Sequence, residues 1–145
     1  MERTERRKVL VCSCERTMPA FGESARRGCE GAEILEGDQL CGAELDRVRA
    51  ALDAGDRVTI ACTQQAPLFL QTAEELRFEG SLDFVNIRET AGWSAEAGAA
   101  GPKAAALLAM AAEPAGAPAA VTLTSGGVVL ILGRDETAIE AGRQL

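Results

Sequence analysis

The residues of this sequence best suited to chemistry are its cysteines, and two of them stand close together near the start. The apolar run KVLVC, residues 8–12, ends on Cys12, and Cys14 follows after one serine. Cys41 precedes a segment with helical spacing, and Cys62 ends a second apolar run, RVTIAC. Cysteine thiolates bind metals and iron–sulfur clusters, or they cycle between dithiol and disulfide.

The chain contains no histidine. This excludes a Ser-His-Asp or Cys-His catalytic pair and any zinc site of mixed cysteine and histidine ligands. The opening MERTERRK is followed by too short an apolar run to be a secretory leader. We therefore expect a cytoplasmic protein, in whose reducing surroundings disulfide scaffolds are rare and thiols serve more often as ligands or redox groups.

Composition bounds the remaining function classes. The 145 residues carry a formal charge of -7, and the few basic clusters lack interleaved aromatic residues. Nucleic acid is therefore not an expected partner. No apolar run approaches the roughly 18 residues of a membrane span, so we expect no membrane association.

Short apolar runs alternate with helical patterns, which is typical of βαβ units around a parallel sheet. Strands are predicted at 8–12, 32–35, 57–62 and 82–87. Helices are predicted at 42–56, 66–80 and 102–113, with a short helix within 15–28. The predicted fold is a Rossmann-like, three-layer αβα domain with a mainly parallel sheet, spanning residues 1–113.

The composition changes after this domain. Residues 114–120 are rich in proline and alanine and predict a linker. Within 121–145, two β-branched runs split by two glycines predict a hairpin over 121–133, and 134–145 predicts a helix. This strand-helix segment has no later strand to return to. We interpret it as the start of a following domain in a longer protein, or as a unit that docks on the edge of the sheet.

The predicted fold brings the cysteines together. Cys12 and Cys62 end parallel strands, whose carboxyl ends share one edge of the sheet. Cys14 lies two residues beyond Cys12, and Cys41 is expected at a helix N-terminus, where the dipole favours a thiolate. Four thiolates at one place indicate an iron–sulfur cluster or a structural zinc ion. The spacing lacks the paired knuckles of most structural zinc sites and also differs from the compact ferredoxin motif.

Four segments occur in a fixed order: VLVCSC, QLCGAEL, IACTQQAPLF and VNIRETAGW. Together they resemble the N-terminal domain of the flavin-bearing subunit of heterodisulfide reductase and of related bacterial [4Fe-4S] ferredoxin-like proteins, over roughly residues 8–110. The resemblance implies one [4Fe-4S] cluster on Cys12, Cys14, Cys41 and Cys62, which an aerobically prepared fragment can lose. It further implies an electron-transfer module, not catalytic alone, that works with downstream flavin or ferredoxin domains and redox partner proteins.

In that family a flavin-binding G-x-G-x-x-G loop follows. Here Gly133 is followed by Asp135 and Ala138 at the positions of the second and third glycines. A negative side chain opposes the approach of a pyrophosphate, so we expect no dinucleotide binding by this segment.

Three further residues are candidate cofactor-binding groups at the same edge. Arg88 would offset the charge of a thiolate-bound cluster, Trp93 would shield it from water, and Gln64 would donate hydrogen bonds to sulfur. A surface ion pair, a core tryptophan and a helix cap are the respective structural alternatives. Cys29 has no counterpart in the family pattern and is expected to be a core or partly exposed thiol.

Two other functions are compatible with these residues. One is a thiol–disulfide redox or sensor module that uses Cys12 and Cys14, or one of them with Cys41. The other is a docking domain with a zinc ion on four cysteines, or with no metal, inside a larger oxidoreductase.

Overall fold

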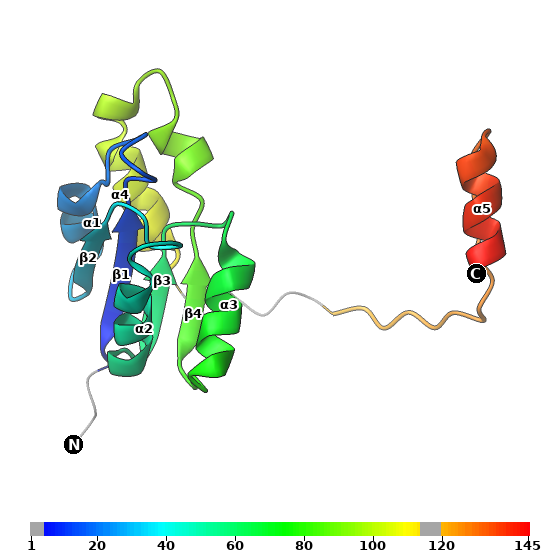
Figure 1. The fold of residues 1–145 in the computed structure, drawn as a ribbon, viewed down its shortest axis with the longest axis horizontal. Coiled ribbons are helices and arrows are strands. Elements are labelled where there is room, and N and C mark those ends of the chain that lie inside the picture. The colour runs from blue at the N-terminus through cyan, green and yellow to red at the C-terminus, as the bar shows by residue number, and fades with distance from the viewer. Residues whose placement is uncertain (1–4, 114–119) are drawn as a thin grey trace. The chain divides into compact units, whose positions relative to one another are not determined.

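Four parallel strands form a single sheet in the first part of the chain (Figure 1). The structure is a computed structural model, and it describes residues 5–113 and 120–145. The strands are β1 (Arg7–Cys12), β2 (Glu33–Gly37), β3 (Arg57–Ile60) and β4 (Ser81–Phe84). Their order is β2-β1-β3-β4, and each neighbouring pair is parallel. The predicted α/β class is confirmed.

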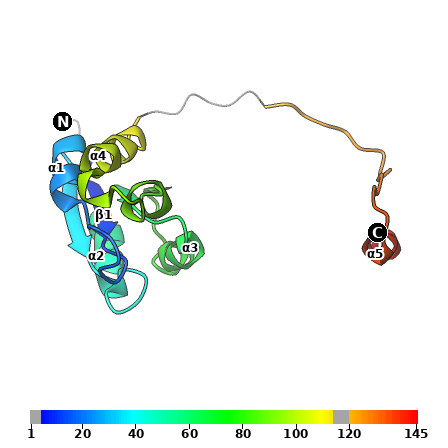
Figure 2. The same ribbon diagram turned by 90° about the horizontal axis from the view of Figure 1, so that it is seen from above.

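Helices cover both faces of the sheet and complete the three layers (Figures 1 and 2). One face carries α1 (Gly22–Gly28) and α4 (Gly101–Met110), and the other carries α2 (Leu45–Ala54) and α3 (Ala66–Glu75). Between β4 and α4 the chain forms a π-helical turn, η1 (Arg88–Gly92), and a short 3-10 helix, η2 (Ala97–Ala99).

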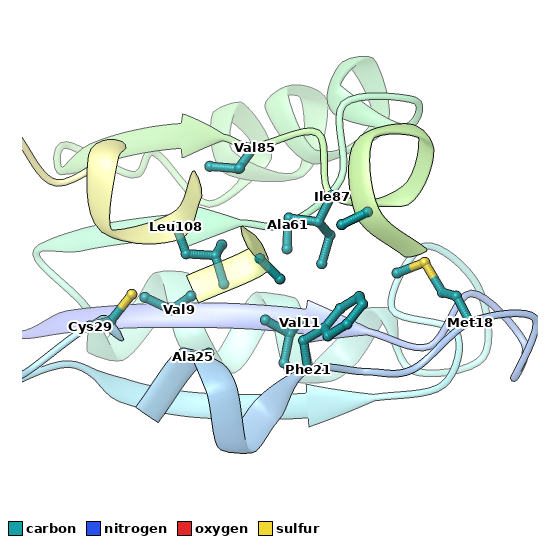
Figure 3. Close-up of a cluster of buried hydrophobic side chains, with 12 residues drawn as sticks. Val9, Val11, Met18, Phe21, Ala25, Cys29, Ala61, Val85, Ile87 and Leu108 are labelled. Carbon is teal, nitrogen blue, oxygen red and sulfur yellow. The ribbon is translucent and has the colours of Figure 1, made fainter. Parts of the chain in front are cut away.

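Both faces of the central strand β1 are buried, which explains the unbroken apolar run in its sequence. Val9 and Val11 belong to the cluster under α1 and α4, whereas Leu10 belongs to the cluster under α2 and α3. Successive side chains of a strand point to opposite faces, and here both faces are covered, so all three residues are buried. Figure 3 shows Val9 and Val11 in one cluster with Leu108 of α4.

The third and fourth strands end earlier than predicted, at Ile60 and Phe84. The amide of Ala61 still donates to the carbonyl of Leu10 in β1, but the amide of Cys62 donates back to the carbonyl of Ile60 at 2.8 Å. This turn ends the ladder and places Cys62 in a loop. The apolar pattern runs past the strand because the start of the loop is buried, not because pairing continues.

One helix begins later than predicted. The amides of Gly42 and Glu44 donate to the carbonyl of Gln39 at 3.0 and 3.1 Å, which makes a turn before α2 starts at Leu45. The short helix predicted within 15–28 is present at Gly22–Gly28, after a turn in which Cys14, Glu15 and Arg16 have positive φ.

The chain divides into two units, Met1–Pro114 and Ala115–Leu145. In the second, the predicted hairpin is wrong: the described residues 120–133 form no strand, and Leu123 and Leu130 are exposed. β-branched composition alone does not establish strand pairing. The predicted terminal helix is present as α5 (Glu136–Gln144). The predicted linker falls on 114–119, outside the described residues, and on residue 120.

Within the described ranges, no helix is long and apolar enough to cross a membrane.

Arg57 connects the sheet to the end of α4. Its guanidinium donates to the carbonyls of Ala111 and Ala112, at 2.8 and 3.2 Å, and to the Asp83 carboxylate at 3.1 Å. These bonds satisfy carbonyls that the end of a helix leaves without partners.

We expect Arg57→Met to lower the free energy of unfolding by about 1–3 kcal/mol, because it removes partly buried charge-assisted hydrogen bonds. Urea unfolding followed by circular dichroism measures this change. Arg27→Met is the matched control, since Arg27 lies on the exposed side of α1 and pairs with Glu23 alone within the described ion pairs. Equal stability of the two variants would contradict the role given to Arg57.

Candidate four-cysteine site

The candidate site lies at the carboxyl ends of β1 and β3. The loop after β1 leads to α1 on one face of the sheet, whereas the loop after β3 leads to α3 on the other. Connections that diverge in this way open a crevice at the strand ends, which is where open α/β sheets bind their ligands. The fold therefore provides a binding position between these two strands.

Four cysteines line one cavity of about 110 Å³ in this crevice: Cys12, Cys14, Cys41 and Cys62. Cys12 ends β1, Cys14 lies in the next turn, Cys41 lies in the turn after β2, and Cys62 follows β3. The structure thus brings together the thiols that the sequence predicts to converge. Apolar side chains form much of the remaining wall, among them Leu10, Leu40, Ile60 and Phe69.

Cys29 lies elsewhere. It is 3% exposed and belongs to the cluster under α1 and α4. Figure 3 places it at the end of that cluster opposite Met18, a residue that also lines the cysteine cavity. Burial raises the pKa of the Cys29 thiol. Its position is that of a core thiol.

The turn that carries Cys14 has an unusual backbone. Cys14, Glu15 and Arg16 all adopt positive φ, at 51°, 60° and 62°. Left-handed conformations cost non-glycine residues roughly 1–2 kcal/mol each, so other contacts must hold them.

Asp38, in the loop after β2, supplies those contacts. Its carboxylate accepts hydrogen bonds from the Ser13 hydroxyl at 2.7 Å and from Arg16 Nε at 2.8 Å. Its carbonyl accepts a hydrogen bond from the Glu15 amide at 2.7 Å. Hydrogen bonds from Ser13 and Arg16 hold the pKa of the Asp38 carboxyl below its usual value. Sequence reasoning missed Asp38, although its place directly after a strand at the cysteine edge was a usable signal.

The protonation of two thiols follows from their burial. Burial raises the pKa of the Cys12 thiol, which donates a hydrogen bond to the Asp38 carbonyl at 3.1 Å. Burial also raises the pKa of the Cys41 thiol, and negative charge on Cys62, Cys12 and Cys14 raises it further.

The expectation that a helix N-terminus favours a Cys41 thiolate is wrong. Because α2 begins only at Leu45, Cys41 lies in the preceding turn. In the loop just before it, the Glu44 carboxylate accepts hydrogen bonds from the backbone amides of Asp38 and Gln39, at 2.5 and 2.7 Å.

In the part of the chain that the structure describes, no three cysteine or carboxylate side chains are gathered closely enough to hold a metal ion. The four thiols surround the cavity without converging on one point. Binding there requires the thiols to lose their protons and at least the Cys12 side chain to leave the Asp38 carbonyl.

Of the three candidate cofactor-binding residues, Arg88 contacts the other two. Arg88 lines the cavity, and its Nη1 lies 3.9 Å from Cys14 Sγ. Its Nη2 donates to Gln64 Oε1 at 3.2 Å, and its guanidinium lies 4.4 Å from the centre of the Trp93 ring. Gln64 reaches the cavity through Arg88, whereas its neighbour Gln65 lines the wall directly.

Trp93 is not a core residue, because it is 53% exposed. Its indole Nε1 donates to the Thr17 hydroxyl at 3.1 Å, beside the turn that carries Cys14. It covers the outer side of Arg88 and is not among the residues that line the cavity.

At the start of α5, the Asp135 carboxylate accepts a hydrogen bond from the Thr137 amide at 3.1 Å. The helix N-terminus that would bind a phosphate in a dinucleotide-binding loop thus has an internal anionic cap.

Comparison with protein-family models, with curated proteins and with solved structures gave no match.

Replacing Asp38 tests how the Cys14 turn is held. We expect Asp38→Ala to increase amide hydrogen exchange of residues 14–18 several-fold, because the Ser13 and Arg16 side chains lose their acceptor. Asp46→Ala, which removes an exposed carboxylate from α2, serves as the control. Unchanged exchange in the Asp38 variant would show that the turn is held by its own backbone.

The raised thiol pKa values predict how the metal-free protein responds to pH. A group whose pKa is higher in the folded state stabilises the fold fully below its unfolded pKa, about 8.5 for cysteine, and loses that contribution as pH rises. The free energy of unfolding can be measured with urea at about pH 7.5 and at about pH 9.5, in the presence of a chelator and a phosphine reductant. Between these pH values it should fall more in the wild type than in a Cys12→Ala/Cys41→Ala double variant. Parallel losses in both proteins would contradict the burial of these thiols.

Proposed function

We propose that residues 1–113 form an electron-transfer domain that binds one [4Fe-4S] cluster through Cys12, Cys14, Cys41 and Cys62. The observation that carries the proposal is the shared cavity of these four thiols at the carboxyl ends of the strands. The fifth cysteine, Cys29, does not line this cavity and is buried in the hydrophobic cluster under α1 and α4.

The donor set and the cavity fit such a group. Protein iron–sulfur clusters are held by cysteine thiolates, commonly four of them. A cluster is larger than one ion, so cysteines from three separate loops can surround it. A cavity of about 110 Å³ exceeds the space that a single bound ion needs. Apolar walls limit access by water, which is one of the factors that set cluster potentials.

When bound, the cluster supplies one-electron transfer without substrate chemistry. The residues of this chain would hold it and exclude water, and the domain alone carries out no catalytic step. The resemblance of residues 8–110 to the N-terminal domain of the flavin-bearing subunit of heterodisulfide reductase supports this role. By the same resemblance we propose downstream flavin or ferredoxin domains and redox proteins as partners, in a reducing cytoplasm.

The zinc alternative uses the same four thiols. A tetrahedral zinc site needs four ligand atoms about 2.0–2.3 Å from one point. Among the described residues no group of three suitable side chains could hold a metal ion as placed, so zinc and a cluster both require the cysteine side chains to move. The cavity volume of about 110 Å³ and the resemblance of residues 8–110 favour the larger group.

The thiol–disulfide alternative has one contact in its favour. The Cys14 amide donates to Cys12 Sγ at 3.4 Å, and a backbone donor of this kind stabilises a thiolate. A Cys12–Cys14 disulfide would close a small ring under strain and would be reduced easily.

Anaerobic reconstitution with ferrous iron and sulfide tests the proposal. The wild-type chain should become brown, with broad visible absorption and nearly equal amounts of iron and sulfide. Cys12→Ala, Cys14→Ala, Cys41→Ala and Cys62→Ala should each lose most of the bound iron, because a cluster corner loses its ligand. Cys29→Ala is the matched control and should keep wild-type iron content.

Equal iron retention in all five variants would rule out the assigned ligands. A colourless wild-type protein that binds zinc stoichiometrically would instead favour the docking domain. A reversible disulfide found by mass spectrometry, without iron, would favour the thiol redox module.

A further inference from the structure

Arg88 is the one lysine or arginine among the described residues that line the four-cysteine cavity. Its Nη1 faces Cys14 Sγ at 3.9 Å, within the range of a hydrogen bond to sulfur. A guanidinium remains charged at all ordinary pH values, so this contact is a permanent positive charge beside one proposed ligand.

The guanidinium is held from three other sides. Arg88 Nε donates to the Glu89 carboxylate at 2.7 Å, and Nη2 donates to Gln64 at 3.2 Å. The Trp93 ring stacks against the guanidinium at 4.4 Å. The side chain is 20% exposed. With Cys14, these partners fix the orientation of the planar guanidinium. The Arg88 side chain therefore loses little conformational entropy when a negative charge appears on Cys14.

The backbone that carries Arg88 is anchored on both sides. Ile87 and Ala91 are buried in the cluster under α1 and α4. A side chain at Gly92 would overlap the side chain of Met18, so glycine allows η1 to lie against the loop that carries Cys14. Asn86 adds a hydrogen bond, in which its Oδ1 accepts from the Glu89 amide at 3.2 Å.

Arg88 and Glu89 oppose each other electrostatically at this position. Arg88 offers positive charge to Cys14, while the Glu89 carboxylate shares the same guanidinium and partly neutralises it. Net charge and hydrogen bonds to the sulfurs are main determinants of iron–sulfur reduction potentials.

We infer that the Arg88–Glu89 pair sets the reduction potential of the four-cysteine site through Cys14, an inference that rests on the proposed function. Reduction adds one electron, supplied in the experiment by dithionite, and forms or breaks no bond. The added negative charge is favoured by Arg88 and disfavoured by Glu89. The two residues therefore act in opposite directions.

Potentiometric titration of the reconstituted full chain, followed by electron paramagnetic resonance, tests the inference. Arg88→Gln should shift the potential to more negative values, and Arg88→Lys should shift it less because the charge is kept and the fork is lost. Glu89→Gln should shift the potential in the opposite direction, to more positive values. Arg27→Gln makes the same change of net charge on α1, away from the cavity, and should have little effect.

A second readout needs no metal. Trp93 is the single tryptophan of the chain and lies against Arg88. Quenching of its fluorescence by iodide, relative to neutral acrylamide, reports the local charge. Iodide is an anion, so positive charge near Trp93 increases the ratio of iodide quenching to acrylamide quenching. Compared with wild type, this ratio should fall in Arg88→Gln and rise in Glu89→Gln, and high salt should reduce both differences.

The outcomes separate the inference from the function on which it rests. Normal iron content with equal potentials in Arg88→Gln, Glu89→Gln and wild type would overturn the inference alone. Shifts of the same sign in both variants would also overturn it, because a merely structural effect would not depend on the sign of the charge. A wild-type chain that takes up no iron and sulfide would overturn the proposed function and the inference together.

Discussion

The pairing of β1 with a parallel neighbour on each side is the constraint on which the cysteine cavity depends. Cys12 lies opposite Gly37 of β2, and Leu10 lies opposite Ile60 of β3. With this register the three strands end at the same edge. Because the loops after β1 and β3 leave toward opposite faces, the edge opens between them. Thiols far apart in the sequence then line the same cavity.

Hydrogen bonds of polar residues around the cavity hold these loops in place. Asp38 ties the loop after β2 to the left-handed turn after β1. Arg88 ties the segment after β4 to Cys14 and to Gln64 in the loop after β3. Every loop that ends a strand at this edge is thus joined to another by a charge-assisted hydrogen bond. Such bonds are about twice as strong as neutral ones and are directional, which suits a site that must be preorganised.

The sequence allowed the order of strands and helices to be predicted, because apolar periodicity follows burial closely. It placed the end of β3 too late for the same reason, since Ala61 is buried although the ladder ends at Ile60. The hairpin predicted at 121–133 is absent, because β-branched composition alone does not establish strand pairing.

That the four cysteines line one cavity could be predicted from topology, whereas the details of the site could not. The partners of Asp38 lie more than twenty positions away, and no local pattern connects them. The raised pKa of the Cys41 thiol could not be predicted either, because it depends on burial, on where α2 begins and on three neighbouring thiols. Trp93 could not be placed, since both a core and a surface position agree with its local sequence.

Iron K-edge X-ray absorption of the anaerobically reconstituted chain tests the central claim most directly, because it reports the atoms bound to iron. A [4Fe-4S] core on four thiolates should give a first shell of sulfur alone and a clear iron–iron shell. A first shell containing nitrogen or oxygen, or the absence of iron–iron scattering, would contradict the assignment of Cys12, Cys14, Cys41 and Cys62 as ligands of such a cluster.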